Sequence, residues 1–477
     1  MAAPKIGGVG RGLVSIDAVS DDAVASVAAA LAQWAAGYSF EDIPVEVANE
    51  AKRCLLDATG VAIAGSEHPI AILLRDQVSA QYGAGPCSII GGEAPASPAG
   101  AALANGTAAH VLDFDDVSYE GMVHATAVVW PAVLAAAELV AANGRDSLTA
   151  FVAAVEAEYA LGRAFTHDLF WRGWWTTGLL GALGAAVGAS KVLGATPDTM
   201  QQAISIAACQ TSGPYVLVGS PVKPVACGRA AELGVQAALL AEAGMTAPED
   251  AFENPHGLIA MFGDGTFQPN ELEKLGNRYV LSTSRVAFKR YPVCAGAQSG
   301  IEALVGLMQD EALASDDVVG IRCEVTPDVG HYMAYDRPQS VSEAQFSLPF
   351  CLACAAIHGD ISVSHLDESY IQSAHIRERM KTVSVIHSEK LAAEEAASLD
   401  VHQPARVTVL TRDRREASAF IPAPTGMPAN PMSDAELDAK FIDAAGHVLS
   451  AAEAERLKRR LRSFETLAST SELLRDL

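Results

Sequence analysis

The chain has 477 residues, half of them hydrophobic but only 6% aromatic, and a formal net charge of −24 at pH 7. This length allows two or more domains with a large core, and an apolar content made mostly of alanine, valine and leucine favours closely packed helices. The acidic balance and the absence of a long basic cluster argue against nucleic acid as a partner.

Helical patterns dominate the first half of the chain. An acidic N-cap at 20–22 is expected to begin a helix that extends to Ala36, and Pro44 begins a second helix that ends near Gly65. The short β-branched run at 86–92 is typical of a brief strand or an extended loop. Recurring apolar positions predict further helices at 98–110, 130–143, 148–165, 177–193, 197–209 and about 228–244.

The pattern changes after a glycine- and proline-rich stretch at 261–277. Runs of β-branched residues predict strands near 281–289, 318–327, 382–388, 405–413 and 416–423. Helices are expected between them at 296–309, 343–358 and 368–381, and after them at 434–450, 451–462 and 465–476. We therefore predict a mainly α protein with an α+β lid, whose sheet is mostly antiparallel, divided into a loose arm (1–23), a helical domain (24–275), the lid (276–425) and C-terminal helices that return to the helical domain (426–477).

No apolar run approaches about twenty residues without charge or glycine, so neither a secretion signal nor a membrane span is expected. The eight cysteines are scattered, and the C-x-x-C pair at Cys351 and Cys354 has no second pair or histidine at zinc spacing. We expect reduced thiols in a cytoplasmic protein without a bound metal.

The densest group of ionisable residues lies between 105 and 136, where small apolar residues flank three aspartates and two histidines. Buried ionisable groups cost free energy unless they are paired, so a chemical use is one interpretation of this density. A solvated acidic turn that caps a helix is the alternative, and the stretch alone does not decide between the two. The residues concerned are His110, Asp113, Asp115, Asp116 and His124.

Three other segments combine a cation with glycine, proline or aromatic neighbours. Trp174 and Trp175 precede a predicted helix whose N-terminal amides could meet an anion, although a hydrophobic plug fits them equally well. Lys223 lies between two prolines, just before a helix expected to begin near Gly228, and is suited to bind a carboxylate. In the third segment Lys289 stands two residues before the phenol of Tyr291.

Taken together, these segments resemble the MmgE/PrpD family, which contains dehydratases, decarboxylases and an epimerase of small carboxylic acids. The matching stretches, in order between about residues 24 and 460, are LLDATGVAIAG, NGTAAHVLDFDD, the His124 turn with WPAVLAAAE, RGWWTTGLLGALGAA, VKPVACGRAAELGVQAALLA, HGLIAMFGDG, FKRYPVCAGAQSGIEAL and RPQSVSEAQFSLPF. The resemblance implies a large helical domain built from both chain ends, a smaller α+β lid, a homodimer, and no metal or organic cofactor.

Carried over by position, the resemblance implies that Asp113 is the catalytic aspartate, His124 its neighbouring histidine, and Lys223 and Lys289 the carboxylate-binding lysines. At four positions this chain departs from the family pattern. Histidines of the family are replaced by Trp175, Ala226 and Gln298, and a tyrosine of some members by Phe350. The substitutes are apolar or neutral, which predicts a pocket less able to hold several carboxylates.

The resulting hypothesis is a lyase of the dehydratase or decarboxylase kind that moves a proton at the carbon α to a carboxylate of a small organic acid. His124 would be the general acid/base, and Asp113 would orient it or share the proton. The two lysines would bind the carboxylate and stabilise enolate-like charge. An epimerase using the same proton abstraction and a diverged binding protein without activity are the alternatives. The residues expected to contact substrate are Trp174, Trp175, Tyr291, Gln298 and Phe350.

Overall fold

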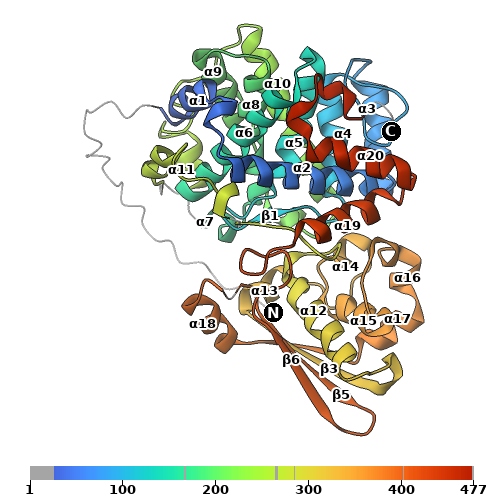
Figure 1. Cartoon of the computed structure of the whole chain (residues 1–477). Helices are drawn as coiled ribbons and strands as arrows, with labels where there is room; N and C mark the ends of the chain where they lie inside the picture. The colour runs from blue at the N-terminus through green and yellow to red at the C-terminus, as the bar shows by residue number, and fades with distance from the viewer. Residues whose placement is uncertain (1–25, 166–167, 264–266, 284, 401, 475–477) are drawn as a thin grey trace, which may run out of the picture.

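The computed structural model describes residues 26–165, 168–263, 267–283, 285–400 and 402–474. In these ranges the chain forms a large helical part and a smaller part with helices and a four-stranded sheet (Figure 1). The prediction of a mainly α fold with an α+β part is confirmed. The expected loose arm at 1–23 and the acidic N-cap at 20–22 lie outside the described residues.

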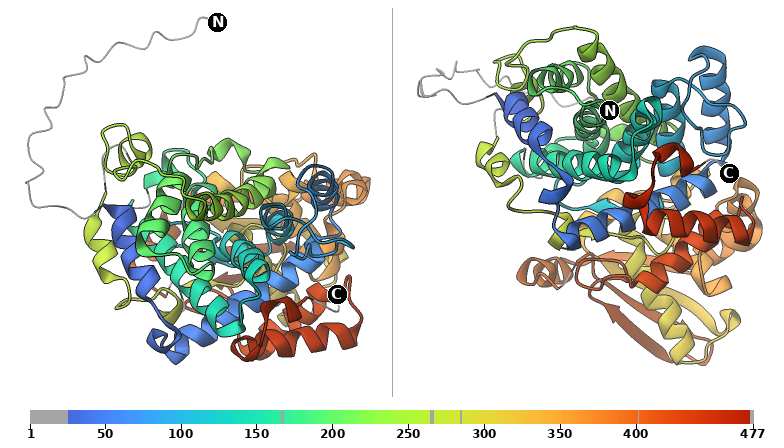
Figure 2. Two further views of the ribbon diagram at one scale, coloured as in Figure 1. Left: turned by 90° about the horizontal axis from the view of Figure 1, so that it is seen from above. Right: turned by 45° about the horizontal axis from the view of Figure 1, so that its top comes forward.

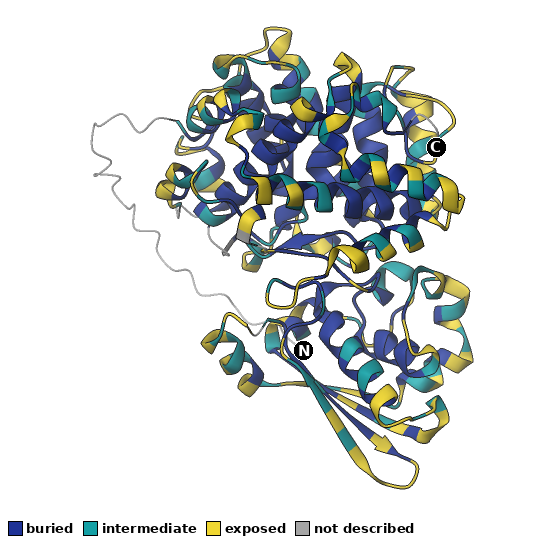
Figure 3. Cartoon of the chain, in the orientation of Figure 1, coloured by how far each residue is buried: buried dark blue, intermediate teal, exposed yellow. Residues whose placement is uncertain are grey.

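The helical part contains α1 (Val27–Gly37), α2 (Val45–Gly65), α3 (Pro69–Gln81), α4 (Pro98–His110), α5 (Ala125–Val140), α6 (Gly144–Ala164), α7 (Asp168–Trp171), α8 (Thr176–Val192), α9 (Pro197–Ala208), α10 (Val222–Glu242) and α11 (Leu258–Phe262). Helix α8 packs against α5, α6 and α10, and its small residues make this possible. A Cβ added at Gly188 would lie 2.7 Å from Val133 of α5 and 3.0 Å from Ala154 of α6. The centre of the helical part is accordingly buried throughout (Figure 3).

The α+β part contains α12 (Ala295–Asp310), β3 (Val318–Val325), α13 (Pro327–Tyr332), α14 (Val341–Ala344), α15 (Leu348–His358), α16 (Glu368–Gln372), α17 (Ala374–Met380), β4 (Val383–His387), α18 (Glu389–Ala397), β5 (Ala405–Thr411) and β6 (Glu416–Ile421). The strand order is β4-β3-β5-β6. Strand β4 runs parallel to β3, and the other two pairings are antiparallel, with Ile321 opposite Val409. Alternate residues of β3 and β5 are buried beneath α12 and α15, which gives this part its own core.

The C-terminal helices α19 (Asp434–Ala445) and α20 (Ala451–Arg462) lie against α2, far from them in sequence (Figure 2). Gly60 of α2 allows this approach, because a Cβ there would be 2.8 Å from the ring of Phe441. A two-stranded sheet of β1 (Val117–Ser118) and β2 (Val286–Ala287) also joins two segments that are far apart in the sequence. The residue boundaries predicted for the domains stay predictions.

Several local predictions were wrong. Helix α10 begins at Val222 and not near Gly228, because proline is tolerated in the first turn of a helix, so Lys223 lies inside that turn. Helices α3 and α18 were not predicted. Of the helix expected at 465–476, the described residues form only short 3-10 turns. No helix in the described ranges is long and apolar enough to cross a bilayer.

Candidate active site

The turn that follows α4 carries most of the ionisable residues singled out in the sequence. Its backbone N–H at Asp113 donates to the carbonyl of His110 at 3.1 Å, and Asp113 itself has a φ of +48°. A left-handed conformation is uncommon for a residue with a side chain, and such residues gather at functional sites. Asp113 is 3% exposed, so the turn presents a buried carboxylate to the interior.

Two lysines from distant segments hold this carboxylate. Lys223 donates to Oδ1 of Asp113 at 2.6 Å, while Lys289 donates to the Asp113 carbonyl at 2.8 Å and lies 3.4 Å from Oδ2. Burial acts to raise the pKa of Asp113, but the charges of the two lysines outweigh burial and hold the pKa below its usual range. Asp113 is therefore ionised at neutral pH and lies between two buried cations.

A second buried carboxylate, Asp115, joins the two histidines. Its Oδ2 lies 2.9 Å from Nδ1 of His110 and 3.0 Å from Nδ1 of His124, and the latter nitrogen is also 2.9 Å from the Asp116 carbonyl. Burial lowers the pKa of His110 to about 4 and lowers that of His124. Both rings are thus neutral at pH 7, and the acceptors around Nδ1 fix the tautomer that carries its proton there.

The remaining ring nitrogens differ. Nε2 of His110 lies 2.6 Å from Nζ of Lys223 and accepts its hydrogen bond. Nε2 of His124 has no hydrogen-bond partner among the described residues, although His124 lines a cavity. A neutral imidazole whose Nδ1–H is held by a carboxylate, and whose Nε2 is free, can accept a proton from a bound molecule.

Behind this turn, the C-terminal helix α19 supplies a third buried lysine. Lys440 lies 2.6 Å from Oδ1 of Asp57 on α2 and donates to the carbonyl of Phe114 at 2.8 Å. Its ammonium also stands 4.0 Å from the centre of the Phe114 ring. Because Phe114 follows Asp113 directly, Lys440 fixes the turn from the side away from the cavity.

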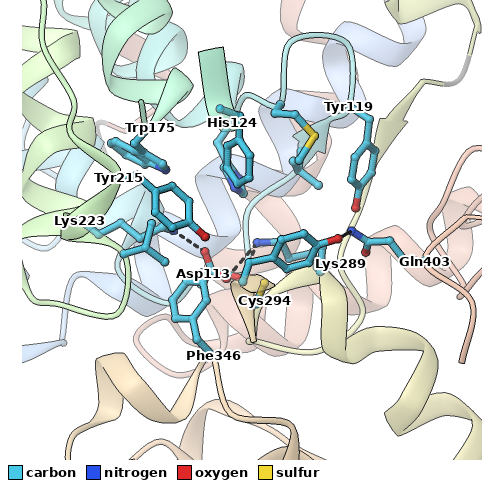
Figure 4. Close-up of a pocket in the computed structure, with 16 residues that line it drawn as sticks. Asp113, Tyr119, His124, Trp175, Tyr215, Lys223, Lys289, Cys294, Phe346 and Gln403 are labelled. Atoms are coloured by element: carbon cyan, nitrogen blue, oxygen red, sulfur yellow. Dashed lines mark hydrogen bonds and ion pairs between the residues drawn. The ribbon is translucent and has the colours of Figure 1, made fainter. Parts of the chain in front are cut away.

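The cavity brings together residues from both parts of the molecule (Figure 4). The cavity has a volume of about 80 Å³, so it is narrow. We call Asp113, His124, Lys223 and Lys289 its ionic side and Tyr119, Tyr332 and Gln403 its neutral side. The other lining residues are Val117, Met122, Phe170, Trp175, Tyr215, Val218, Cys294, Ala295 and Phe346.

The segment that carries Tyr119 and His124 is placed by a contact between two glycines. Gly121 has a φ of +88°, and a Cβ there would lie 2.8 Å from the Cα of Gly162 on α6. Only glycine fits both the conformation and the approach. Further along, Thr177 of α8 accepts a hydrogen bond from the His124 backbone N–H at 3.0 Å, which fixes the start of α5.

Comparison with known proteins places the chain in a family. The model of the MmgE/PrpD N-terminal domain matches residues 29–270, and that of the MmgE/PrpD C-terminal domain matches residues 291–466. The chain belongs to the MmgE/PrpD family. The family resemblance expected from the sequence is thereby confirmed.

Curated MmgE/PrpD relatives match almost from end to end. The cis-aconitate decarboxylase-like protein oryM of Aspergillus oryzae is 27% identical over 94% of this chain and 96% of its own length. The cis-aconitate decarboxylases of Aspergillus terreus and Homo sapiens are each 26% identical, over 95% and 90% of this chain and 96% and 89% of their own lengths. These relatives support a lyase of the dehydratase or decarboxylase kind.

Of the nine residues predicted for the site of this MmgE/PrpD protein, five line the cavity: Asp113, His124, Trp175, Lys223 and Lys289. Trp175 also packs against the ring of His110, at a centroid distance of 5.4 Å. The ionic side gathers all four residues for which a catalytic role was expected.

The other four predicted residues do not line the cavity. Trp174 packs against Phe262 at a centroid distance of 4.4 Å. Tyr291 and Phe350 are buried in the core of the α+β part. Their prediction as site residues was wrong because periodicity alone does not tell which buried face reaches a cavity. Gln298 accepts from the backbone N–H of Tyr291 at 3.0 Å and donates to its carbonyl at 3.0 Å, so its amide supports the segment after Lys289 instead of a ligand.

Of the four positions at which this chain departs from the family pattern, only one lines the cavity. Ala226, Gln298 and Phe350 stand where the family has polar groups, yet none of them lines the cavity, so the difference in lining rests on Trp175. Ala226 lies on α10, on a separate surface hollow.

Sequence reasoning missed all three residues of the neutral side. Tyr119 belongs to the acidic stretch at 105–136 and could have been found there. Tyr332 and Gln403 lie in segments without any recognisable motif, and they reach the cavity only because the α+β part folds over it. His110 was noted in the sequence but not chosen, although it bonds to Lys223 and Asp115.

His110, Asp115 and His124 are also a possible metal-binding set, since one donor atom from each lies within 4.8 Å of the others. Two imidazoles and a carboxylate suit several divalent cations. In the present arrangement both Nδ1 atoms already stand at hydrogen-bond distance from Asp115, and Asp115 is fully buried. Direct hydrogen bonds account for these distances, so we assign no cation to the set.

Proposed function

We propose that this MmgE/PrpD protein is a lyase that transfers a proton at the carbon α to a carboxylate of a small organic acid. One observation carries the proposal. His124, a neutral imidazole whose Nε2 has no partner among the described residues, lines the same cavity as the buried Lys223 and Lys289. A base and a cationic carboxylate site in one enclosed space are what α-proton abstraction requires.

In the proposed reaction the substrate carboxylate binds at the two lysines, which stabilise the negative charge that spreads onto it in the enolate-like intermediate. His124 Nε2 accepts the α-proton and forms an imidazolium, while Asp115 holds Nδ1–H and favours that charge. In a dehydration, the electron pair left on carbon then expels a β-hydroxyl as water, with the imidazolium returning the proton. In a decarboxylation, His124 first takes a proton from solvent at Nε2. CO₂ then leaves, and the imidazolium gives that proton to the carbanion.

The charge on the ionic side limits the substrate. Lys223 and Lys289 carry two positive charges and Asp113 one negative charge, so a bound acid meets a net charge of about +1. An unpaired carboxylate in a narrow cavity costs several kcal/mol. Trp175 adds an apolar surface where the family has histidine. We therefore propose a mono- or dicarboxylate with an apolar portion, in contrast to the cis-aconitate named for the relatives.

The test is solvent exchange and product analysis with the purified protein. In D₂O, a panel of mono- and dicarboxylates is followed by NMR for loss of the α-C–H signal, and release of water or CO₂ is measured beside it. Exchange in at least one small acid, with little turnover of cis-aconitate or 2-methylcitrate, is the expected result. Efficient decarboxylation of cis-aconitate contradicts the substrate proposal, and no exchange in any acid contradicts the proton-transfer chemistry. Exchange with inversion and without a leaving group identifies an epimerase.

A further inference from the structure

The neutral side of the cavity contains buried polar atoms that the proposed reaction does not use. Tyr119 Oη and Gln403 Oε1 are both inaccessible to solvent and have no hydrogen-bond partner among the described residues. Both side chains line the cavity, and in Figure 4 the Tyr119 hydroxyl points toward the Gln403 side chain, on the side opposite Lys223. Buried polar atoms are nearly always paired, so these two atoms call for a partner that enters the cavity.

Hydrogen bonds on both sides fix the backbone of Gln403 in a strained conformation. Its φ is +47°, a conformation that glutamine rarely adopts, and its backbone is anchored at both ends. The N–H donates to Oε1 of Glu395 at 2.8 Å, and the carbonyl accepts from Oγ of Ser299 at 2.6 Å. A strained residue that its surroundings hold in place is characteristic of sites where a side chain must be aimed.

The Gln403 amide is also oriented. Its Nε2 donates to the hydroxyl of Tyr332 at 2.8 Å, which leaves Oε1 as an acceptor. Tyr119 supplies the complementary group, a phenol whose ring packs edge-on against His402 at a centroid distance of 4.1 Å. Burial raises the pKa of Tyr119 and of Tyr332 well above the usual value, so both hydroxyls keep their protons. The pair thus offers one acceptor and one hydroxyl that can donate or accept.

Two carboxylates act electrostatically on this pair. Glu395 touches the Gln403 backbone, and its charge and that of Asp113 both add to the raised pKa of Tyr119. Among the three residues of the neutral side none is cationic. A second carboxylate would lose its hydration here without gaining a positive partner, whereas a hydroxyl or an amide would satisfy both orphan atoms.

We propose that Tyr119 and Gln403 form a subsite for an uncharged hydroxyl or amide group at the end of the substrate remote from the carboxylate held by Lys223 and Lys289. The subsite assumes the carboxylate site of the function proposed above and adds the class of substrate: an acid with a polar, uncharged distal end. Tyr119 and Gln403 are then specificity-determining residues, and the apolar lining between the two sides contacts the carbon chain.

Binding of four matched probes tests the subsite without depending on turnover. Pentanoate, its ω-hydroxy and ω-amide derivatives, and glutarate share one chain and differ only at the distal end. Titration calorimetry with the wild-type protein is expected to show about tenfold tighter binding of the hydroxy and amide probes than of pentanoate or glutarate. The same series one carbon shorter guards against a mismatch in length.

Three variants connect that preference to the two residues. Tyr119→Phe removes only the hydroxyl, and Gln403→Leu removes the amide. Gln403→Asn keeps an amide but withdraws it by one methylene, and asparagine tolerates a positive φ well, so this variant remains informative if Gln403→Leu does not fold. Each variant is expected to reduce the preference to less than about threefold, mainly because the hydroxy and amide probes bind more weakly. Tyr370→Phe and Gln210→Leu make the same changes outside the cavity and should leave the preference intact.

The outcomes separate the subsite from the proposed reaction. Equal affinity for the four probes, tightest binding of glutarate, no measurable binding of any probe, or a preference that survives all three variants overturns the subsite. If the preference follows Tyr119 and Gln403 but no acid exchanges its α-proton in D₂O, the subsite stands and the proton-transfer function fails. Exchange without any distal preference supports the proton-transfer function and overturns the subsite.

Discussion

The two sides of the cavity solve the problem of burying polar groups in different ways. On the ionic side, opposite charges neutralise one another: Asp113 lies between Lys223 and Lys289, at 2.6 and 3.4 Å from their ammonium groups. On the neutral side, Tyr119 and Gln403 leave atoms without partners among the described residues. A paired network is fixed before any ligand arrives, while orphan atoms gain from a ligand. Under the two proposals, this difference corresponds to a side that reacts and a side that recognises the substrate.

Replacing His124 is the strongest way to break the ionic side. His124→Gln keeps a polar side chain but removes the base, and we expect α-proton exchange to fall about 100- to 10 000-fold. Exchange is measured by NMR in D₂O at saturating acid. His375→Gln changes an exposed histidine of α17 and should retain full activity. Exchange within about threefold of wild type in His124→Gln contradicts the role of His124 as general base.

Removal of Lys440 tests how the ionic side is supported from behind. Lys440→Met leaves the buried Asp57 without its partner and releases the Phe114 carbonyl, and should cost about 3–5 kcal/mol of unfolding free energy. Urea denaturation measures the loss. The exposed pair of Lys381 and Glu378 provides the control, because Lys381→Met should cost no more than about 1 kcal/mol. Similar losses in both variants show that Lys440 has no special structural role.

The pH dependence of stability sharpens the comparison through His110, which bonds to Asp115 and to Lys223 of the ionic side. The pKa of His110 is lowered to about 4 in the folded state, so the unfolded chain binds more protons between about pH 6.5 and 4. Neutral His110 therefore makes its full contribution to the free energy of unfolding above about pH 6.5. This contribution, on the order of 3 kcal/mol, is lost as the pH falls from about 6.5 to 4. Asp116 and Glu158, whose pKa values burial raises, act in the opposite direction.

The effect of His110 is therefore measured by comparing how the unfolding free energies of the wild type and of His110→Gln change with pH. Denaturation at pH 7 and pH 5 should show a smaller fall in stability, or a larger gain, for the variant than for the wild type. Identical pH slopes contradict a neutral, buried His110. Asp113 and Asp115, with lowered pKa values, contribute stability that is lost only below about pH 4 and does not disturb this window.

The smallest effect is expected at Cys294, which lines the cavity but belongs to neither side. Burial raises the pKa of its thiol to about 11, so it is neither a nucleophile nor a charge at neutral pH. Cys294→Ala should change the exchange rate by less than about threefold. In the native protein, iodoacetamide at pH 8 should label the exposed Cys209 and spare Cys294, as peptide mass spectrometry can show. Rapid labelling of Cys294 contradicts this assignment.

The sequence predicted elements well where local signals agree. Strands β3, β4, β5 and β6 follow β-branched runs, and α4 follows Ser97 and Pro98, a cap and a first-turn proline. Helix α3 was missed because His68 caps it, which is an unusual residue for that position. Helix α18 was missed because only Leu391 is buried along it, so apolar periodicity is weak.

For the site too, only residues with a distinctive local sequence could be predicted. Asp113, His124, Lys223 and Lys289 could be found because their neighbours are distinctive in sequence. Gln298 and Phe350 were misplaced because a residue's type does not reveal which neighbour its side chain faces, and Gln298 turned out to bond to its own backbone segment. Gln403 could not be predicted, since its place in the cavity depends on long-range packing and on an unusual φ.

The contact of Gly121 with Gly162 has a consequence for reading mutational scans of this protein. Neither residue lines the cavity, yet a side chain at either position would push apart α6 and the segment that holds Tyr119 and His124. A scan scored by activity alone would rank both glycines beside His124. Scoring abundance in parallel would separate them, because a steric wedge lowers the amount of folded protein, whereas loss of a base leaves the amount unchanged.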